Sequence, residues 1–148
     1  MSMITIVTII FMVLEFGNIL MMYLMPEFKL SNGIGVFNAW GKSKENEEMH
    51  TLAKYLLRWV ANTKLIFIGL LIVILIWGTP QVKLYSMIVM AVTTLIFFFT
   101  QFPIMRKADK NGNIAPKGYS LILFCEVFLI TGMFLATFVL SLMGIVPY

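Results

Sequence analysis

The sequence predicts an all-α integral membrane protein, built as a bundle of four transmembrane helices. Composition is the first observation: 60% of the 148 residues are apolar and 12% are charged, whereas soluble domains carry about a quarter charged residues. The second is a mean hydropathy of +0.93. The third is a series of four apolar stretches, each close to the ~20 residues that cross a bilayer. A soluble domain cannot cover so much apolar surface, so we expect one membrane domain over residues 1–148.

The first span is expected over residues 3–25 and ends before Pro26, which cannot continue a helix. This stretch lacks the basic n-region and the small-residue cleavage site of a signal peptide, so we interpret it as a retained helix. Glu15 and Asn18 interrupt it near the middle. They are three residues apart and therefore lie on one helical face.

Residues 26–48 form the longest connection, and they are too apolar for a solvated loop. Glycines oppose a long helix here, while Ile34, Phe37 and Trp40 favour contact with the membrane. We expect an interfacial or re-entrant segment over about residues 31–42, with Trp40 as an anchor among the lipid headgroups. A flap over the mouth of a cavity is the alternative.

The second span, residues 52–77, has a polar beginning and an unbroken apolar end. Lys54, Arg58 and Asn62 are spaced four residues apart and share one face of the helix. About thirteen apolar residues follow Lys64, and at ~1.5 Å per residue they cover roughly 20 Å of a ~30 Å hydrocarbon core. The charged segment must therefore enter the membrane, where other helices accommodate it.

The third span is expected over residues 84–102, after a tight turn at residues 78–80 and before Pro103. Its threonines are expected to donate hydrogen bonds to the carbonyl groups of their own helix. Residues 106–118 then form a short polar turn.

The fourth span is expected over residues 119–146 and carries Glu126 in its first third. Cys125 lies in the same apolar run and is predicted to be a buried, inert thiol. Gly132 and Ala136 form a pair of small residues four apart, a pattern typical of helix packing in membranes.

The basic residues predict the orientation. Ten of the eleven flank the first and third connections, and Lys83 alone belongs to the second. Because cytoplasmic connections carry an excess of Lys and Arg, we expect connections one and three in the cytoplasm and both termini outside. The expected location is the cell (cytoplasmic) membrane, crossed several times.

Several classes of site are excluded by what the sequence lacks. A single histidine and a single cysteine exclude bis-His haem ligation within one chain and a cysteine metal cluster. We find no nucleophile–base set and no metal-ligand spacing, so we predict no catalytic residue, no metal and no cofactor. The basic residues flank apolar spans, so membrane lipids, not nucleic acid, are the expected partners.

Polar groups at membrane depth are the candidate site, because they are costly there and commonly functional. The candidates for substrate contact or proton coupling are Glu15, Asn18, Lys64 and Glu126, and those for a polar site at the cytoplasmic face are Arg58 and Asn62. Lys64 and Glu126 lie at similar depth and are expected to pair. Glu15 is too short to reach water by snorkelling, so it is the candidate functional carboxylate.

Two families of membrane proteins share this layout. With Glu15 midway along the first of four spans, the chain resembles the small multidrug-resistance exporters, although it is longer and its second helix is polar. The series Arg58, Asn62 and Leu65 is similar to the Arg-x-x-x-Asn-x-x-Glu pattern in the second helix of MAPEG proteins, which are membrane enzymes linked to glutathione and eicosanoids. Leucine stands where that pattern has its acid, and this removes part of what would hold glutathione.

Three functions follow as hypotheses. The first is a carrier or channel coupled to ions or protons, acting on a small molecule or ion as a homo-oligomer, because four helices alone seldom enclose a hydrated path. The second, implied by the resemblance to MAPEG proteins, is a glutathione- or lipid-modifying enzyme with its site near Arg58 and Asn62. The third is a non-catalytic subunit of a larger membrane complex, whose polar groups pair with a partner subunit.

Overall fold

The computed structural model describes residues 1–29 and 34–146, and in these ranges the protein is helical, without strands. Its elements are α1 (Met3–Leu24), the short 3₁₀ turn η1 (Ile34–Val36), α2 (Asn38–Ser43), α3 (Glu47–Trp77), α4 (Pro80–Thr100), α5 (Phe102–Lys110) and α6 (Tyr119–Leu142). Four helical stretches are long and apolar enough to cross a membrane: α1, α3, α4 continued by α5, and α6. The prediction of an all-α protein with four such helices is confirmed.

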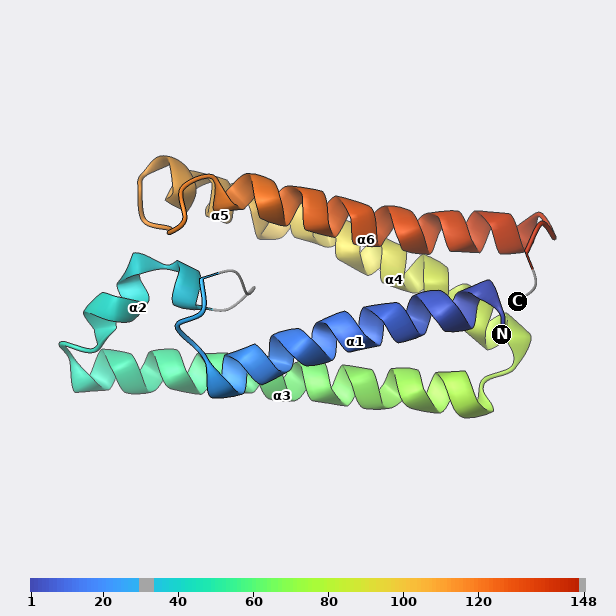
Figure 1. Ribbon diagram of the computed structural model, residues 1–148, viewed down its shortest axis with the longest axis horizontal. Coiled ribbons are helices and arrows are strands. Elements are labelled where there is room, and N and C mark those ends of the chain that lie inside the picture. The colour runs from blue at the N-terminus through green and yellow to red at the C-terminus, as the bar shows by residue number, and fades with distance from the viewer. Residues whose placement is uncertain (30–33, 147–148) are drawn as a thin grey trace.

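The long helices form two pairs that converge at one end of the molecule (Figure 1). α1 packs along α3 and α4 packs along α6, while α1 also contacts α6 and, over a shorter stretch, α4. The start of α1 and the end of α6 lie at the converging end, and α2 and α5 lie at the other (Figure 1). The helix pairs therefore lie closest at the end with the termini and the turn between α3 and α4, and farther apart at the end with the first and third connections, which we call the open end (Figure 1).

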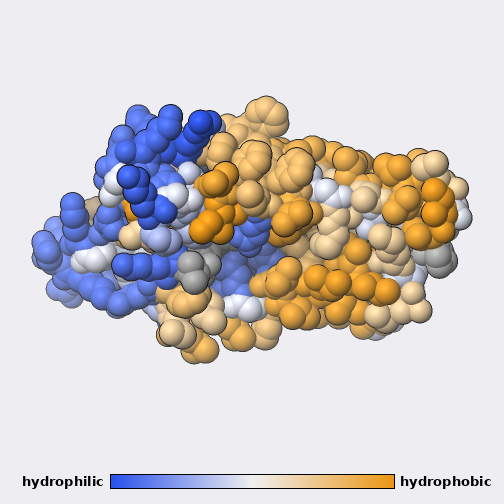
Figure 2. Space-filling model, turned by 45° about the horizontal axis from the view of Figure 1, so that its top comes forward, coloured by the Kyte–Doolittle hydropathy of each residue, from blue (hydrophilic) through white to orange (hydrophobic). Residues whose placement is uncertain are grey.

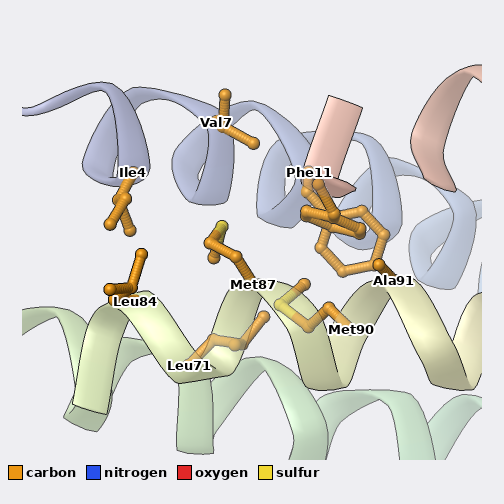
Figure 3. Packing of buried hydrophobic residues seen from close by; sticks show 9 residues of the cluster. Ile4, Val7, Phe11, Leu71, Leu84, Met87, Met90 and Ala91 are labelled. Carbon is orange, nitrogen blue, oxygen red and sulfur yellow. The ribbon is translucent and has the colours of Figure 1, made fainter. Parts of the chain in front are cut away.

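An apolar cluster between the two pairs closes the converging end. Ile4, Val7 and Phe11 of α1 are buried there. They face Met87, Met90 and Ala91 of α4, with Leu71 of α3 beside them, and Phe134 of α6 completes the cluster (Figure 3). In α1 the three buried residues are spaced three and four apart, so one helical stripe makes this contact.

The connections at the open end bind to each other. Phe37 and Ile114 form an isolated antiparallel β-bridge, and the backbone N–H of Asn38 donates to the backbone carbonyl of Asn113 at 2.9 Å. The N–H of Ala115 donates to the Val36 carbonyl at 2.8 Å. The segment after α1 is thereby fastened to the segment before α6, and the two helix pairs are joined at this end as well.

Residues 106–118 differ from the predicted polar turn, because α5 extends through Lys110. We expected Pro103 to end the span, but it lies in the first turn of α5, where its missing N–H breaks no helical hydrogen bond. The turn itself begins at Asn111 and continues through Gly112, whose φ of 70° is a conformation that glycine adopts without strain.

Asp109 holds this turn together. Its Oδ1 accepts a hydrogen bond from the Gly118 N–H at 2.9 Å, and its Oδ2 accepts from the Ser120 N–H at 3.0 Å and the Ser120 hydroxyl at 2.6 Å. Both N–H groups belong to the start of α6, which has no partner for them within its own first turn. Asp109 therefore caps α6 from a neighbouring helix.

Two other boundaries differ from those predicted. α3 begins at Glu47, five residues before residue 52, because the Asn46 side chain accepts a hydrogen bond from the Met49 N–H at 3.1 Å and caps the helix. α6 ends at Leu142, before residue 146, and Gly144 follows with a φ of 69°. The prediction for the threonines is confirmed: Thr93 and Thr100, for example, donate to carbonyl groups four residues earlier.

The surface separates into a polar end and an apolar body (Figure 2). Large apolar side chains, such as Ile66 and Phe99, are exposed along the body. Only 17–28% of the most apolar stretch of each span is buried within the protein. Lipid can surround these exposed side chains at no cost, so the surface agrees with a multi-pass membrane protein.

Candidate functional site

The centre of the candidate site is an ion pair between α1 and α3. The Lys64 ammonium nitrogen lies 2.7 Å from Oε2 of Glu15, and the two side chains are 27% and 19% exposed. Glu15 is twelve residues from Met3 and Lys64 is thirteen from Trp77, which at ~1.5 Å per residue places both about 18–20 Å from the converging end. This depth lies within a hydrocarbon core of ~30 Å.

The partner of Lys64 differs from the predicted one. We expected Glu126, because both residues lie at similar depth, but the ammonium group contacts Glu15. The reason is helix pairing: α3 packs along α1, whereas α6 packs along α4. Glu126 lies on an exposed face of α6.

Asn18 lies one turn from Glu15 on the same face of α1. Its side-chain oxygen is buried and accepts no hydrogen bond from the described residues. Such an orphan acceptor is uncommon in a folded protein and calls for a donor. A ligand or a water molecule beside the ion pair would supply one.

A second polar group stands nearer the open end. The Tyr23 hydroxyl donates a hydrogen bond to the side-chain oxygen of Asn62, and the Arg58 guanidinium lies 4.8 Å from the centre of the Tyr23 ring. Arg58 and Asn62, predicted together from their spacing, are thus joined through α1. Leu65, at the position of the acid in the MAPEG pattern, is 39% exposed and contributes no charge.

Trp40 does not lie where the sequence predicts. It was expected to anchor at the lipid headgroups, but it is buried and packs against Ile19, Met22 and Leu57. Its ring also lies 5.0 Å from that of His50. Trp40 therefore fastens α2 to the α1–α3 pair. Of the predicted interfacial segment, residues 31–33 lie outside the described residues, and η1 and α2 make up most of the rest.

Two features of α6 also differ from expectation. Cys125 is exposed on the outer surface of the helix, not buried. Nothing within the described chain packs on Gly132, because a Cβ built there meets no atom within 4 Å. Both residues face away from α4 because the inner stripe of α6 is occupied by larger residues such as Val127 and Phe134.

A cavity of about 470 Å³ lies between the two helix pairs, on the side of Lys64. Val60 and Lys64 of α3 form one wall, Phe97 of α4 another, and Leu123 and Val127 of α6 a third. Within the described residues Lys64 is its only charged lining group, with Gln101 and Tyr119 as the other polar ones. Mostly apolar walls with a few polar groups are typical of small-molecule sites of 300–1,000 Å³.

A smaller cavity of about 240 Å³ extends the first toward the converging end. Phe97 and Val127 line both cavities, which are therefore adjacent. Aromatic rings dominate the smaller one: Phe11 packs edge-on against Phe67 and Phe134, at ring distances of 6.0 and 5.1 Å. Thr93 and Thr94 also line it, but their hydroxyl groups are engaged with their own helix.

Sequence reasoning missed Tyr23, Gln101 and the phenylalanines of the cavities. Gln101 was noted only as a polar end to a span, and phenylalanines are common throughout the chain. The one available signal was the spacing of Glu15 and Tyr23, which are eight residues apart and so share a face of α1. No protein-family model, curated protein or solved structure matches this chain, so its family is not assigned by comparison.

Proposed function

We propose that this protein is a small ion-coupled carrier of the cell membrane, acting as a homo-oligomer, in which Glu15 and Lys64 couple a proton to a substrate. One observation carries the proposal: Lys64 pairs with Glu15 and also lines the cavity between the helix pairs. Ionisable groups at this depth are costly in lipid and commonly mark a path for substrates or ions.

The ion pair with Lys64 changes the role that we propose for Glu15. The sequence predicted an unpaired carboxyl group that exchanges a proton by itself, and a permanent pair with Lys64 argues against that mechanism. We propose instead that the pair opens when a substrate engages Lys64. Glu15 then loses its counter-ion in an environment of low dielectric and takes up one proton from water. Substrate and proton are loaded together.

The charged groups around Glu15 are few. Of the helices packed against α1, α3 supplies Lys64, α6 carries Glu126 on an exposed face, and Lys83 of α4 lies near the converging end. Among the described residues Lys64 forms its ion pair with Glu15, so Glu15 is the carboxylate that a bound substrate would displace.

Orientation and assembly complete the proposal. Apart from Lys64 in the middle of α3 and Lys83 near the converging end, the basic residues lie toward the open end, so we place that end in the cytoplasm. The cavities between the four helices are partly open to the surroundings, so one chain alone does not enclose them. The exposed apolar faces of α1 and α3 leave room for a second copy of the chain. We therefore propose that the functional carrier is a symmetric homo-oligomer, because most oligomers of identical chains are symmetric.

Substrate uptake into reconstituted vesicles tests the coupling, because an anion that enters with one proton moves no net charge. Uptake of panels of anionic, cationic and neutral solutes would be measured with and without a pH gradient, and a trapped dye would report the internal pH. We expect the uptake of at least one class to depend on the gradient. Glu15→Gln, which keeps the shape and removes the charge, should abolish that dependence. Glu48→Gln, in the exposed first turn of α3, is the matched control and should behave as the unmodified protein. Unchanged pH-dependent uptake by Glu15→Gln would refute the proposal.

A MAPEG-like enzyme is the second candidate, favoured by the contacts among Tyr23, Arg58 and Asn62. A guanidinium beside a hydroxyl and an amide can hold a carboxylate such as those of glutathione. Glutathione at 100 times its Kd should then stabilise the fold by roughly 2.7 kcal/mol, and Arg58→Gln should remove the effect. An unchanged unfolding temperature at millimolar glutathione would reject this candidate.

A further inference from the structure

The two adjacent cavities lie in series between the helix pairs and differ in chemical polarity, and together they outline a path for a ligand. Lys64 and Gln101 line the larger cavity, and the smaller one continues past Phe97 and Val127 between aromatic rings. Phe67, which lines the smaller cavity, is three residues after Lys64 on α3, so the step from cation to aromatic wall is one helical turn. A ligand that follows this path meets a cation first and, beyond it, aromatic and other apolar groups with two threonines whose hydroxyl groups are bonded to their own helix.

The charge along the path favours an anion. The larger cavity has one cationic lining residue and no acidic one among the described residues. Arg106 and Lys107 follow the lining residues Ile104 and Met105 along α5 and line a separate surface pocket, so the surface of α5 is also basic. The one acid of α5, Asp109, is engaged in capping α6. A cationic ligand would find no counter-ion on this path apart from the carboxylate that Lys64 already holds.

We infer that the two cavities bind a single-chain amphiphile with one anionic headgroup, such as a medium-chain carboxylate, with its headgroup at Lys64 and its chain toward Phe11, Phe67 and Phe134. This inference deepens the proposed function by naming its substrate class. Lipid is as apolar as the cavity, so moving the alkyl chain from lipid into the cavity gains little free energy. The pairing of the headgroup with Lys64 therefore provides the selectivity.

Equilibrium binding of tritiated dodecanoate to the protein in nanodiscs of zwitterionic lipid tests the inference, with empty nanodiscs subtracted. We expect saturable binding that unlabelled dodecanoate displaces and that dodecyltrimethylammonium and acetate do not. Lys64→Gln should weaken binding at least tenfold. Lys54→Gln, on the exposed surface of α3 and outside the cavity, is the matched control and should bind as the unmodified protein.

The smaller cavity, where the alkyl chain of the ligand is expected to lie, is tested by a separate variant. Thr93→Trp places a large ring in the smaller cavity and should also weaken binding at least tenfold. Val92→Trp, on the neighbouring exposed position, should not. A dodecanoate analogue with a photoreactive chain end should label Phe11, Phe67 or Phe134. Thermal unfolding checks that each variant is folded.

The outcomes separate the inference from the proposed function. Three results would overturn the inference. Lys64→Gln could bind dodecanoate as tightly as the unmodified protein, or dodecyltrimethylammonium could displace bound dodecanoate. The third is that two-chain phosphatidate displaces the label while unlabelled dodecanoate does not. Specific dodecanoate binding without pH-dependent uptake of any solute would support the inference and refute the carrier. Glu15-dependent, pH-dependent uptake of another class of anion without dodecanoate binding would support the carrier and refute the inference.

Discussion

The ammonium group of Lys64 lies 2.7 Å from Oε2 of Glu15, and this contact joins the middle of α1 to the middle of α3. Both side chains are largely buried, so breaking the pair by removing one member leaves the other charge poorly solvated. The pair therefore fixes the relative position of two helices and places a cation on the wall of a cavity. Four predictions follow from it and from the connections at the open end.

Glu15→Ala and Lys64→Ala should each destabilise the protein by several kcal/mol, because each leaves the other charge unpaired. The double change should cost less than the sum, with a coupling energy of about 0.5–3 kcal/mol. Unfolding in mixed micelles with increasing dodecyl sulfate measures the cycle. The same cycle with Glu126 in place of Glu15 is the comparison, and a larger coupling there would show that the sequence-based pairing was correct.

Both connections at the open end should face the cytoplasm. On a Cys125→Ser background, cysteines introduced at Ser43 and Asn111 should resist an impermeant maleimide applied to intact cells and react after the membrane is opened. A cysteine at Ser2 should react from outside. The basic residues at the open end are the physical reason. Labelling of position 43 or 111 in intact cells would contradict the orientation.

Asp109→Ala should destabilise α6 by about 2 kcal/mol or more, because it leaves the N–H groups of Gly118 and Ser120 without their buried acceptor. Ser120→Ala removes one hydroxyl and should cost about 1 kcal/mol. Hydrogen exchange at the first turn of α6 should accelerate in both variants, more in the first. Equal exchange in Asp109→Ala and the unmodified protein would show that the cap contributes nothing.

Gly35→Ala should destabilise the first connection, because a Cβ there would lie 2.2 Å from the Pro26 carbonyl oxygen and the backbone would have to move. Gly41→Ala is its control: a Cβ there meets nothing within 4 Å, and alanine favours the helix by roughly 0.5–1 kcal/mol. The thermal unfolding midpoints of the two variants should therefore shift in opposite directions. A shift in the same direction would contradict the close approach at Gly35.

The sequence by itself determined the class of protein and the four spans. Runs of about twenty apolar residues permit few folds, because every backbone polar group in lipid must be bonded within its own helix. Helix α1 ends within one residue of its predicted end for this reason. The candidate polar residues could also be predicted, since any charged group in such a run is conspicuous.

Only the tertiary structure decided how these groups meet. Depth along a helix can be counted in the sequence, but the direction in which a side chain points depends on which helices pair. Lys64 and Glu126 share a depth, yet α3 packs along α1, so the cation contacts Glu15. Trp40 is apolar enough for lipid or for protein, and the packing of α2 on α3 buried it in protein. The cavities between the helix pairs belong to no single stretch of sequence, because their walls come from helices far apart in the chain.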